Sequence, residues 1–330
     1  MRLFQRSQLL HGVGVFEDEG CRAAERKNVT TAAEIDYCKM LNSVLPEHIQ
    51  AVAWAPCARR DFSARFDCVG RTYKYFFPRG GLDLGAMNEA GARLLGEHDF
   101  RNFCKMDVNN GVVNYMRRIT EVKAETTELS PPRVSGSAAA PDPYTMCLLT
   151  VAGKAFLWHQ IRCVVAVLFR VGEGKESPGV IDELLNVERN PRRPQYVMAS
   201  ELPLNLFDCQ FDDDVDWRYD EESMAFVVRR FQALWTEHQV KASMLRAALE
   251  RLHGEQRERG YGAVEQQASC LISMGKGKTY TPLLDMLKCP SLEEKVSHNE
   301  AKKMRMNDGG GGGGGGGAAG AREAEDADGQ

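Results

Sequence analysis

The chain has 330 residues, 43% of them hydrophobic and 27% charged, which is enough for one large or two small folded domains. No apolar run reaches the roughly 18 residues of a membrane span. Residues 1–20 lack both the apolar stretch of a secretory signal and the basic, acid-poor character of a transit peptide. The sequence therefore predicts a protein of the nucleus and cytoplasm without a membrane partner.

The formal net charge is -4, but the end of the chain contributes most of it. Residues 309–330 hold one Arg against two Glu and two Asp, so the remainder is close to neutral. Because a neutral protein can still bind nucleic acid through a local basic surface, bulk charge does not decide the class of partner.

The ten cysteines are scattered, and no two of them form a C-x-x-C pair. Structural zinc sites need close pairs, because one loop must present two thiolates to one ion. We therefore expect small buried hydrophobic cysteines, with no metal and no cofactor.

In chain order, the first expected helix follows a capping box, Thr31-x-x-Glu34, and stops at Pro46. Residues before it show no clear period. Alternating apolar residues over 62–77, with Gly70 at the bend, predict a β-hairpin. The other expected elements are strands over 49–54, 118–125, 144–151 and 204–211, and helices over 87–95, 157–171, 181–187 and 231–252.

Two segments are expected to lie outside the core: an insertion of Pro, Ser and Ala over 131–143, and a Gly-rich acidic tail that cannot bury enough surface to order. Strands and helices interleave without regular βα units, which favours an α+β fold over a doubly wound sheet.

Arg162 is the most informative single residue, because it lies in a helix that is apolar nearly all round. A guanidinium there needs a carboxylate or phosphate partner. A structural salt bridge and a functional site remain equal alternatives. His159 nearby could serve as a base, although a lone histidine is more often a hydrogen-bonded core residue.

Arg71, Tyr73 and Tyr75 share one face of their strand by period-2 alternation, with Arg65 across the expected hairpin. Interleaved Arg and aromatic groups suit an extruded base and its phosphates. The alternative is ordinary core packing of the tyrosines. The stretch 275–279, GKGKT, resembles a phosphate-binding loop, but residue 272 is Ile where that motif requires Gly, so we reject it.

Four separated blocks in the right order resemble the TruA family of tRNA pseudouridine synthases, and most of all its eukaryotic branch that modifies uridines 38 and 39. The resemblance covers about residues 34–215. The residues that carry it are 62–66 with 71–79, 96–107, 153–162, and Asn190-Pro191 with Pro194-Gln195-Tyr196.

The resemblance implies a TruA-like α+β fold, a mostly antiparallel sheet with flanking helices, whose first half-domain is incomplete here. The expected organisation is an unassigned segment over 1–33, a remnant of the N-terminal half over 34–95, the C-terminal half over 96–215, a helical extension over 216–300 and a disordered tail over 301–330.

The resemblance also implies roles for single residues and for partners. Tyr73 matches the tyrosine that packs on the target base, Leu204 falls where an apolar residue lines the uracil pocket, and Arg162 matches the basic partner of the catalytic aspartate. The implied substrate is the tRNA anticodon stem-loop, without a cofactor, and related proteins are often homodimers. Residues expected to contact the tRNA backbone are Arg65, Arg71, Arg117, Arg192 and Arg193.

One departure from the family pattern is serious. The family's nucleophilic aspartate lies in a Gly-Arg-Thr-Asp-Lys-Gly-Val stretch upstream of the segment that begins here near Glu34, and residues 1–33 contain no such stretch. We therefore expect a sequence truncated at its N-terminus, inactive by itself, in which the expected motif supplies no carboxylate to Arg162. The alternatives are a non-catalytic RNA-binding paralogue and an unrelated protein-interaction domain.

Overall fold

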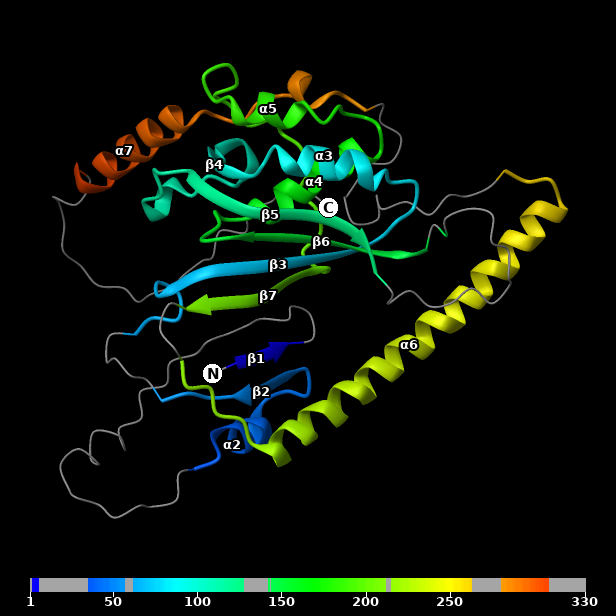
Figure 1. Ribbon diagram of the computed structural model, residues 1–330. Coiled ribbons are helices and arrows are strands. Elements are labelled where there is room, and N and C mark those ends of the chain that lie inside the picture. Colours follow the sequence, from blue (N-terminus) through cyan, green and yellow to red (C-terminus); the bar gives the residue numbers. More distant parts are fainter. Residues whose placement is uncertain are drawn as a thin grey trace, which may run out of the picture.

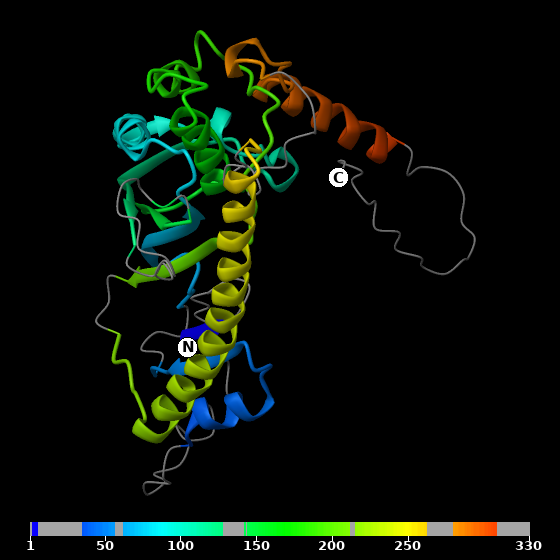
Figure 2. The same ribbon diagram turned by 90° about the vertical axis from the view of Figure 1, so that its right-hand side faces the viewer.

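The computed structural model describes residues 2–5, 35–56, 62–127, 142, 144–211, 215–262 and 280–308. A five-stranded sheet forms the centre, with helices packed on one of its faces, and a long helix, α6 (Glu221–Glu258), runs along its side (Figures 1 and 2). The expected capping box, the insertion, the GKGKT stretch and the Gly-rich run lie outside the described residues, apart from Asp142.

Every neighbouring pair in the five-stranded sheet is antiparallel, as predicted for an α+β fold. β3 is flanked by β6 and β7, so Tyr73 lies opposite Val151 on one side and Leu206 on the other. In spatial order the strands are β4 (Gly96–Asp99), β5 (Met116–Thr126), β6 (Met146–Gly153), β3 (Cys68–Pro78) and β7 (Leu204–Phe211).

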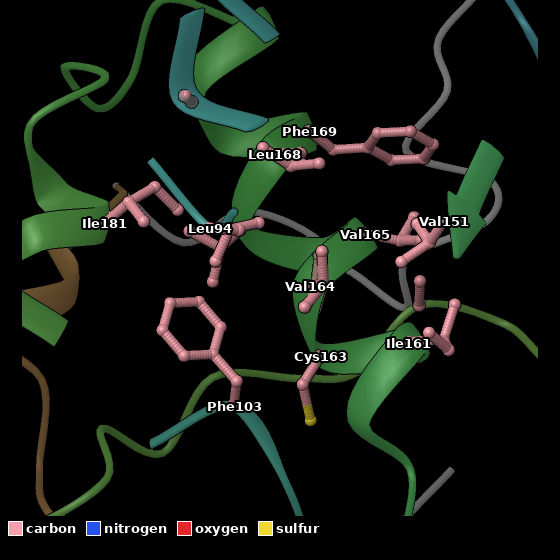
Figure 3. Close-up of a cluster of buried hydrophobic side chains, with 14 of the residues drawn as sticks. Leu94, Phe103, Val151, Ile161, Cys163, Val164, Val165, Leu168, Phe169 and Ile181 are labelled. Atoms are coloured by element: carbon pink, nitrogen blue, oxygen red, sulfur yellow. The ribbon is translucent and has the colours of Figure 1, made fainter. Parts of the chain in front are cut away.

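The core lies between this sheet and α4 (Gln160–Gly172), the predicted apolar helix. Val151 of β6 lies near Val165 and Ile161 of α4, while Leu94 and Phe103 approach α4 from another side (Figure 3). Nearly every residue of α4 is buried, which confirms the prediction from its composition. Burying so many large apolar side chains is the main stabilising contribution to the domain. The helices α3 (Leu84–Ala92) and α5 (Val180–Leu185) are also near their predicted positions.

The predicted hairpin over 62–77 is wrong. Ser63 and Asp67 close a turn, in which the Asp67 N–H donates to the Ser63 carbonyl over 2.9 Å and the Ser63 N–H donates to the Asp67 carboxylate over 2.6 Å. β3 begins only at Cys68, and Gly70 lies inside it, where the register against β7 shifts. These local side-chain hydrogen bonds compete with strand formation, so β3 pairs only with distant strands.

A smaller unit lies beside the edge strand β7. α2 (Tyr37–Val44) begins after Asp36, whose carboxylate accepts the Lys39 N–H, and it ends before Pro46 as predicted. β2 (Ile49–Ala53) confirms the predicted strand there. It pairs with β1 (Arg2–Gln5), a strand that the sequence analysis missed because four residues are too short to show a period.

α6 is longer than predicted, at 38 residues and about 57 Å. Near its start Ser223 donates to the Asp36 carboxylate over 2.9 Å, and near its end Arg246 forms an ion pair with Asp142 at 2.9 Å. The last helix, α7 (Leu292–Asp308), was not predicted, and it continues across the expected boundary at residue 300. No helix in the described ranges combines the length and apolarity needed to cross a membrane.

Candidate functional site

Tyr73 lies on the face of β3 that is turned toward α4, as the predicted alternation with Tyr75 requires. Its ring meets Phe156 edge to face, with the ring centroids 5.3 Å apart. Burial raises the pKa of the Tyr73 phenol, with a smaller opposing effect from Arg71. Tyr73 is therefore a neutral, mostly buried aromatic group in the middle of β3.

Arg162, in the first turn of α4, has two partners from the same nearby turn. Its Nε donates to the Ala199 carbonyl over 2.7 Å, and its terminal nitrogen lies 2.9 Å from a carboxylate oxygen of Glu201. The arginine side chain is 19% exposed and that of Glu201 is 61% exposed. Glu201 thus gives Arg162 a carboxylate partner from outside the missing Gly-Arg-Thr-Asp motif. Sequence patterns contain no signal for Glu201, since only tertiary packing brings it to α4.

The turn that carries Glu201 also positions Leu204. The Tyr75 hydroxyl donates to the Ser200 carbonyl over 3.0 Å, and the Leu204 N–H donates to the Glu201 carbonyl over 3.0 Å. Leu204 then begins β7 directly opposite Tyr75 and packs against the core. Tyr73 and Leu204 therefore lie on the core-facing side of two neighbouring strands, and the turn before Leu204 binds Arg162 at the start of α4.

The loop from β6 to α4 completes this region. His159 has φ of 59°, and it is the one non-glycine residue with positive φ among those that the structure describes. The left-handed conformation costs about 1 kcal/mol for a residue with a side chain. The pKa of His159 is lowered by burial first and then by the charges of Arg162 and Lys105. His159 is therefore held mainly as the neutral imidazole near neutral pH.

The predicted tRNA contacts Arg65 and Arg71 have very different surroundings. Arg71 donates to three main-chain carbonyls, those of Cys68 at 3.3 Å, Lys154 at 2.7 Å and Arg65 at 2.5 Å. This guanidinium fixes the turn before β3 to the loop before α4. The Arg65 side chain is exposed beside Phe66.

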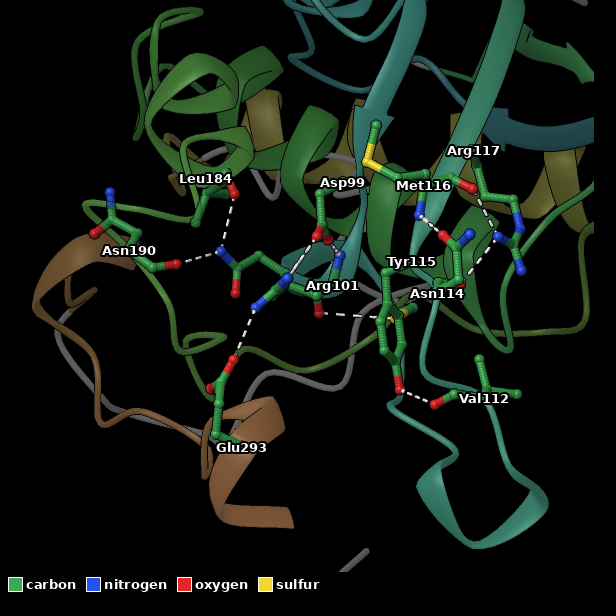
Figure 4. A network of polar contacts seen from close by, with 12 residues as sticks. Asp99, Arg101, Val112, Asn114, Tyr115, Met116, Arg117, Leu184, Asn190 and Glu293 are labelled. Carbon is green, nitrogen blue, oxygen red and sulfur yellow. Dashed lines mark hydrogen bonds and ion pairs between the residues drawn. The ribbon is translucent and has the colours of Figure 1, made fainter. Parts of the chain in front are cut away.

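Arg117, Arg192 and Arg193 each contact other groups of the chain. Arg117 donates to the carbonyls of Asn114 and Met116 within its own turn (Figure 4). Arg192 forms an ion pair with Glu294 of α7. Arg193 donates to the Tyr196 carbonyl over 3.2 Å, with its guanidinium 4.2 Å from the centre of the Tyr196 ring. Each therefore has a structural partner within the chain.

A second polar network ties the neighbouring segments together. Arg101 pairs with Asp99 at 2.7 Å and with Glu293 of α7 at 3.5 Å (Figure 4). The buried Asn102 amide donates to the carbonyls of Leu184 and Asn190 over 2.9 and 2.7 Å. These contacts hold the 190–196 loop against the rest of the site.

The cysteines of the described residues are free thiols, and five of the seven are buried, as the sequence analysis predicted. Burial raises the pKa of the Cys104 thiol to about 12, so it stays protonated. A protonated buried thiol is a poor nucleophile and a poor metal ligand.

The antiparallel sheet with its flanking helices defines an α+β domain. Its site combines an inward tyrosine, an arginine–carboxylate pair and an apolar residue, which suits a planar, hydrogen-bonding group such as a nucleobase. Comparison with known proteins agrees with this class. A family model described as tRNA pseudouridine synthase matches residues 90–212, which include Arg162 and Leu204. The chain belongs to the tRNA pseudouridine synthase family of the TruA type.

Three relatives illustrate the range of similarity. The human tRNA pseudouridine(38/39) synthase is 43% identical over 296 residues, which cover 86% of this chain and 60% of that protein. The protein of the same name from Saccharomyces cerevisiae is 35% identical over 224 residues, covering 67% and 47%. A tRNA pseudouridine synthase A from Methanoculleus marisnigri is 36% identical over 171 residues, covering 52% and 54%. The chain thus spans well under two thirds of the length of these relatives.

Proposed function

We propose that this chain is part of a tRNA pseudouridine synthase that isomerises uridine 38 or 39 in the anticodon stem-loop. In this reaction the bond from N1 of uracil to the ribose breaks, and a bond from C5 of the same base to the ribose forms. The proton of C5 is lost and N1 gains one, so no cofactor is consumed. The observation that carries the proposal is that Tyr73 and Leu204 lie on the core-facing side of neighbouring strands, beside the turn that binds Arg162.

Each of these three groups has a physical role in the proposal. The Tyr73 ring packs on the extruded uracil, whose removal from the stack costs a few kcal/mol that contacts must offset. Leu204 lines the apolar side of the same base. Arg162 holds the catalytic carboxylate ionised, because a cation at hydrogen-bonding distance favours the charged form.

The nucleophile itself is not among these residues. The 330 residues contain Gly-Arg-Thr only as Gly70-Arg71-Thr72, which is followed by Tyr73 within β3. We therefore expect this chain by itself to bind an anticodon stem-loop without converting its uridine. An aspartate in a Gly-Arg-Thr-Asp segment would join or replace Glu201 as a partner of Arg162, since a guanidinium has five N–H donors.

The pairing of Arg162 with Glu201 also favours a second candidate function. A cation that already has a carboxylate partner within the chain needs no nucleophile to balance its charge. A non-catalytic tRNA-binding paralogue would keep this arrangement permanently.

Tritium release from uridine labelled at C5 tests the proposal, because the reaction expels that hydrogen. We expect the 330-residue chain to bind an anticodon stem-loop and to release no tritium. A longer product of the same gene that contains Gly-Arg-Thr-Asp should release it, whereas a gene without this motif would support the paralogue. Tritium release by the 330-residue chain would refute our view of the missing aspartate, and failure to bind RNA would refute both candidates.

Arg65 provides a test of the RNA surface, since its side chain is exposed. Arg65→Ala should weaken RNA binding and make the salt dependence of binding shallower, because one phosphate contact is lost. Arg251→Ala on α6, whose side chain is 79% exposed, is the matched control and should leave both quantities unchanged. If the two variants had the same RNA affinity and the same salt dependence, Arg65 would not contact the RNA.

We also propose that the protein is a homodimer and works in the nucleus and cytoplasm. The exposed face of α6 supports self-association, because Met244 and Leu245 are apolar side chains at high exposure there. A sedimentation coefficient that equals that of a monomer at every protein concentration would contradict the dimer.

A further inference from the structure

Trp158 is a large aromatic side chain that the structure leaves 49% exposed at the entrance to α4. The loop that carries it is firmly held. The Lys105 N–H donates to the Trp158 carbonyl over 3.1 Å, and the Leu157 N–H donates to the Gln160 side chain over 2.8 Å. The indole is therefore presented to solvent by a rigid segment, and its exposure is not the result of a loose loop.

One side of the indole is supported and its surroundings are cationic. The His159 ring lies 4.5 Å from the Trp158 ring, centre to centre, at an interplanar angle of 32°. The Lys105 ammonium lies over the Trp158 ring, 4.9 Å from its centre, so this flexible side chain would have to move aside toward a phosphate when a base stacks. Arg162 follows one turn later on α4, and its own charge is only partly balanced by the exposed Glu201.

We propose that Trp158 is a stacking platform for an unpaired RNA base next to the target nucleotide, with Lys105 placed to contact the adjoining phosphate. An aromatic face can accept any base, and a neighbouring cation suits the backbone that accompanies it. The platform lies on the same loop as Phe156, which packs on Tyr73, so a base on Trp158 would flank the uridine that Tyr73 receives. The inference rests on the proposed function and adds a nucleotide contact to it.

The position of the indole favours RNA over a protein partner. A protein-docking tryptophan is usually surrounded by other apolar groups, whereas Trp158 has Lys105 and Arg162 nearby. Trp235 on α6 offers a useful contrast, because it is 64% exposed and no Lys or Arg side chain of the described residues lies over its ring. Trp235 is therefore the matched control.

The experiment measures binding of an anticodon stem-loop RNA to the 330-residue chain by fluorescence anisotropy. Trp158→Ala should weaken binding about tenfold, which corresponds to the loss of one stacked base. Trp235→Ala should change it less than twofold. Lys105→Gln should reduce the slope of log affinity against log salt by about 0.7, the value for one phosphate of a single strand.

A second measurement separates stacking from a structural role. RNA should quench the tryptophan fluorescence of the unchanged chain, and Trp158→Phe should remove most of this quenching while keeping most of the affinity, because a phenyl ring still stacks. Circular dichroism checks that each variant is folded.

The outcomes distinguish this inference from the proposed function. Binding of Trp158→Ala equal to that of the unchanged chain overturns the platform and leaves the proposed function standing. Absence of RNA binding by the unchanged chain overturns both. A loss of self-association in Trp158→Ala without a change in RNA affinity would assign the indole to a protein contact and overturn the platform.

Discussion

At the scale of single residues, His159 is the most strained group of the site. Its backbone is left-handed, its Nδ1 is buried without a hydrogen-bond partner, and cations lie near its ring. Strain of this kind persists only where the surroundings hold the residue in place, and it is concentrated at functional sites. Here the same conformation turns the chain from the loop into α4 and places Trp158 outside and Arg162 beside Glu201.

The lowered pKa of His159 predicts how stability depends on pH. The folded state holds the His159 proton less tightly than the unfolded state does. The stabilisation of the folded state by neutral His159 is therefore fully present above the ordinary pKa of 6.5, and it is lost as the pH falls through the lower pKa of the folded state. Between pH 7.5 and pH 5.5, the midpoint of urea unfolding should therefore decrease more in the unchanged chain than in His159→Gln. Equal pH dependence of the two proteins would contradict the assignment.

At the scale of elements, the loop between β6 and α4 connects the sheet to the site. It begins at Gly153, which lies opposite Arg71 of β3 and Ile119 of β5. A Cβ on Gly153 would come within 2.6 Å of the Arg118 carbonyl oxygen and 3.1 Å of the Phe156 ring. The absence of a side chain therefore lets three strands and the Phe156 ring meet at one point.

Gly153→Ala should lower the free energy of unfolding by about 1–3 kcal/mol, because backbone must move to make room. It should also weaken RNA binding, since Phe156 and Trp158 follow on the same loop. Gly81→Ala is the control, because its Cβ would meet nothing within 4 Å. Urea denaturation and RNA titration measure the two effects. A Gly153→Ala chain as stable as the control would show that the loop relaxes easily.

At the scale of the whole molecule, α6 connects the β1–β2 unit to the far end of the main sheet (Figures 1 and 2). Its start packs on α2 and β2, where Val227 is buried. Near its end, Arg246 lies between Asp142 and Glu250 at 2.9 Å from each, with Tyr144 against its guanidinium at 4.2 Å. The helix is therefore docked at its start and again at Arg246, 12 residues before its last residue Glu258, and its other residues are largely exposed.

Two matched substitutions test how much the contacts of Arg246 contribute to the stability of the fold. Arg246→Met should lower the free energy of unfolding by about 2 kcal/mol or more, because it removes the cation that faces the mostly buried Asp142. Lys241→Met should change it by less than about 0.5 kcal/mol, since its pair with Glu237 is exposed. Both variants keep an unbranched side chain, so similar losses would indicate that the Arg246 cluster contributes little.

Local patterns in the sequence were sufficient wherever local forces decide the structure. Apolar side chains on all sides of α4 predicted its burial, strands were predicted where β2 and β7 lie, and Pro46 marked the end of α2. The hairpin failed because Ser63 and Asp67 satisfy each other's hydrogen bonds locally and end the extended chain before Cys68. α7 was missed because it is mostly polar and shows no clear apolar stripe.

The sequence by itself determined the family, through blocks of residues in a fixed order, and it determined the helices and strands whose period matches their burial. Only the tertiary structure decided which charges meet. Arg162 pairs with Glu201, 39 residues later in the chain, and Arg71 binds main-chain carbonyls that no sequence pattern identifies. The reason is physical: periodicity reports which face of one element is buried, whereas a hydrogen bond depends on where distant segments lie once the core has packed.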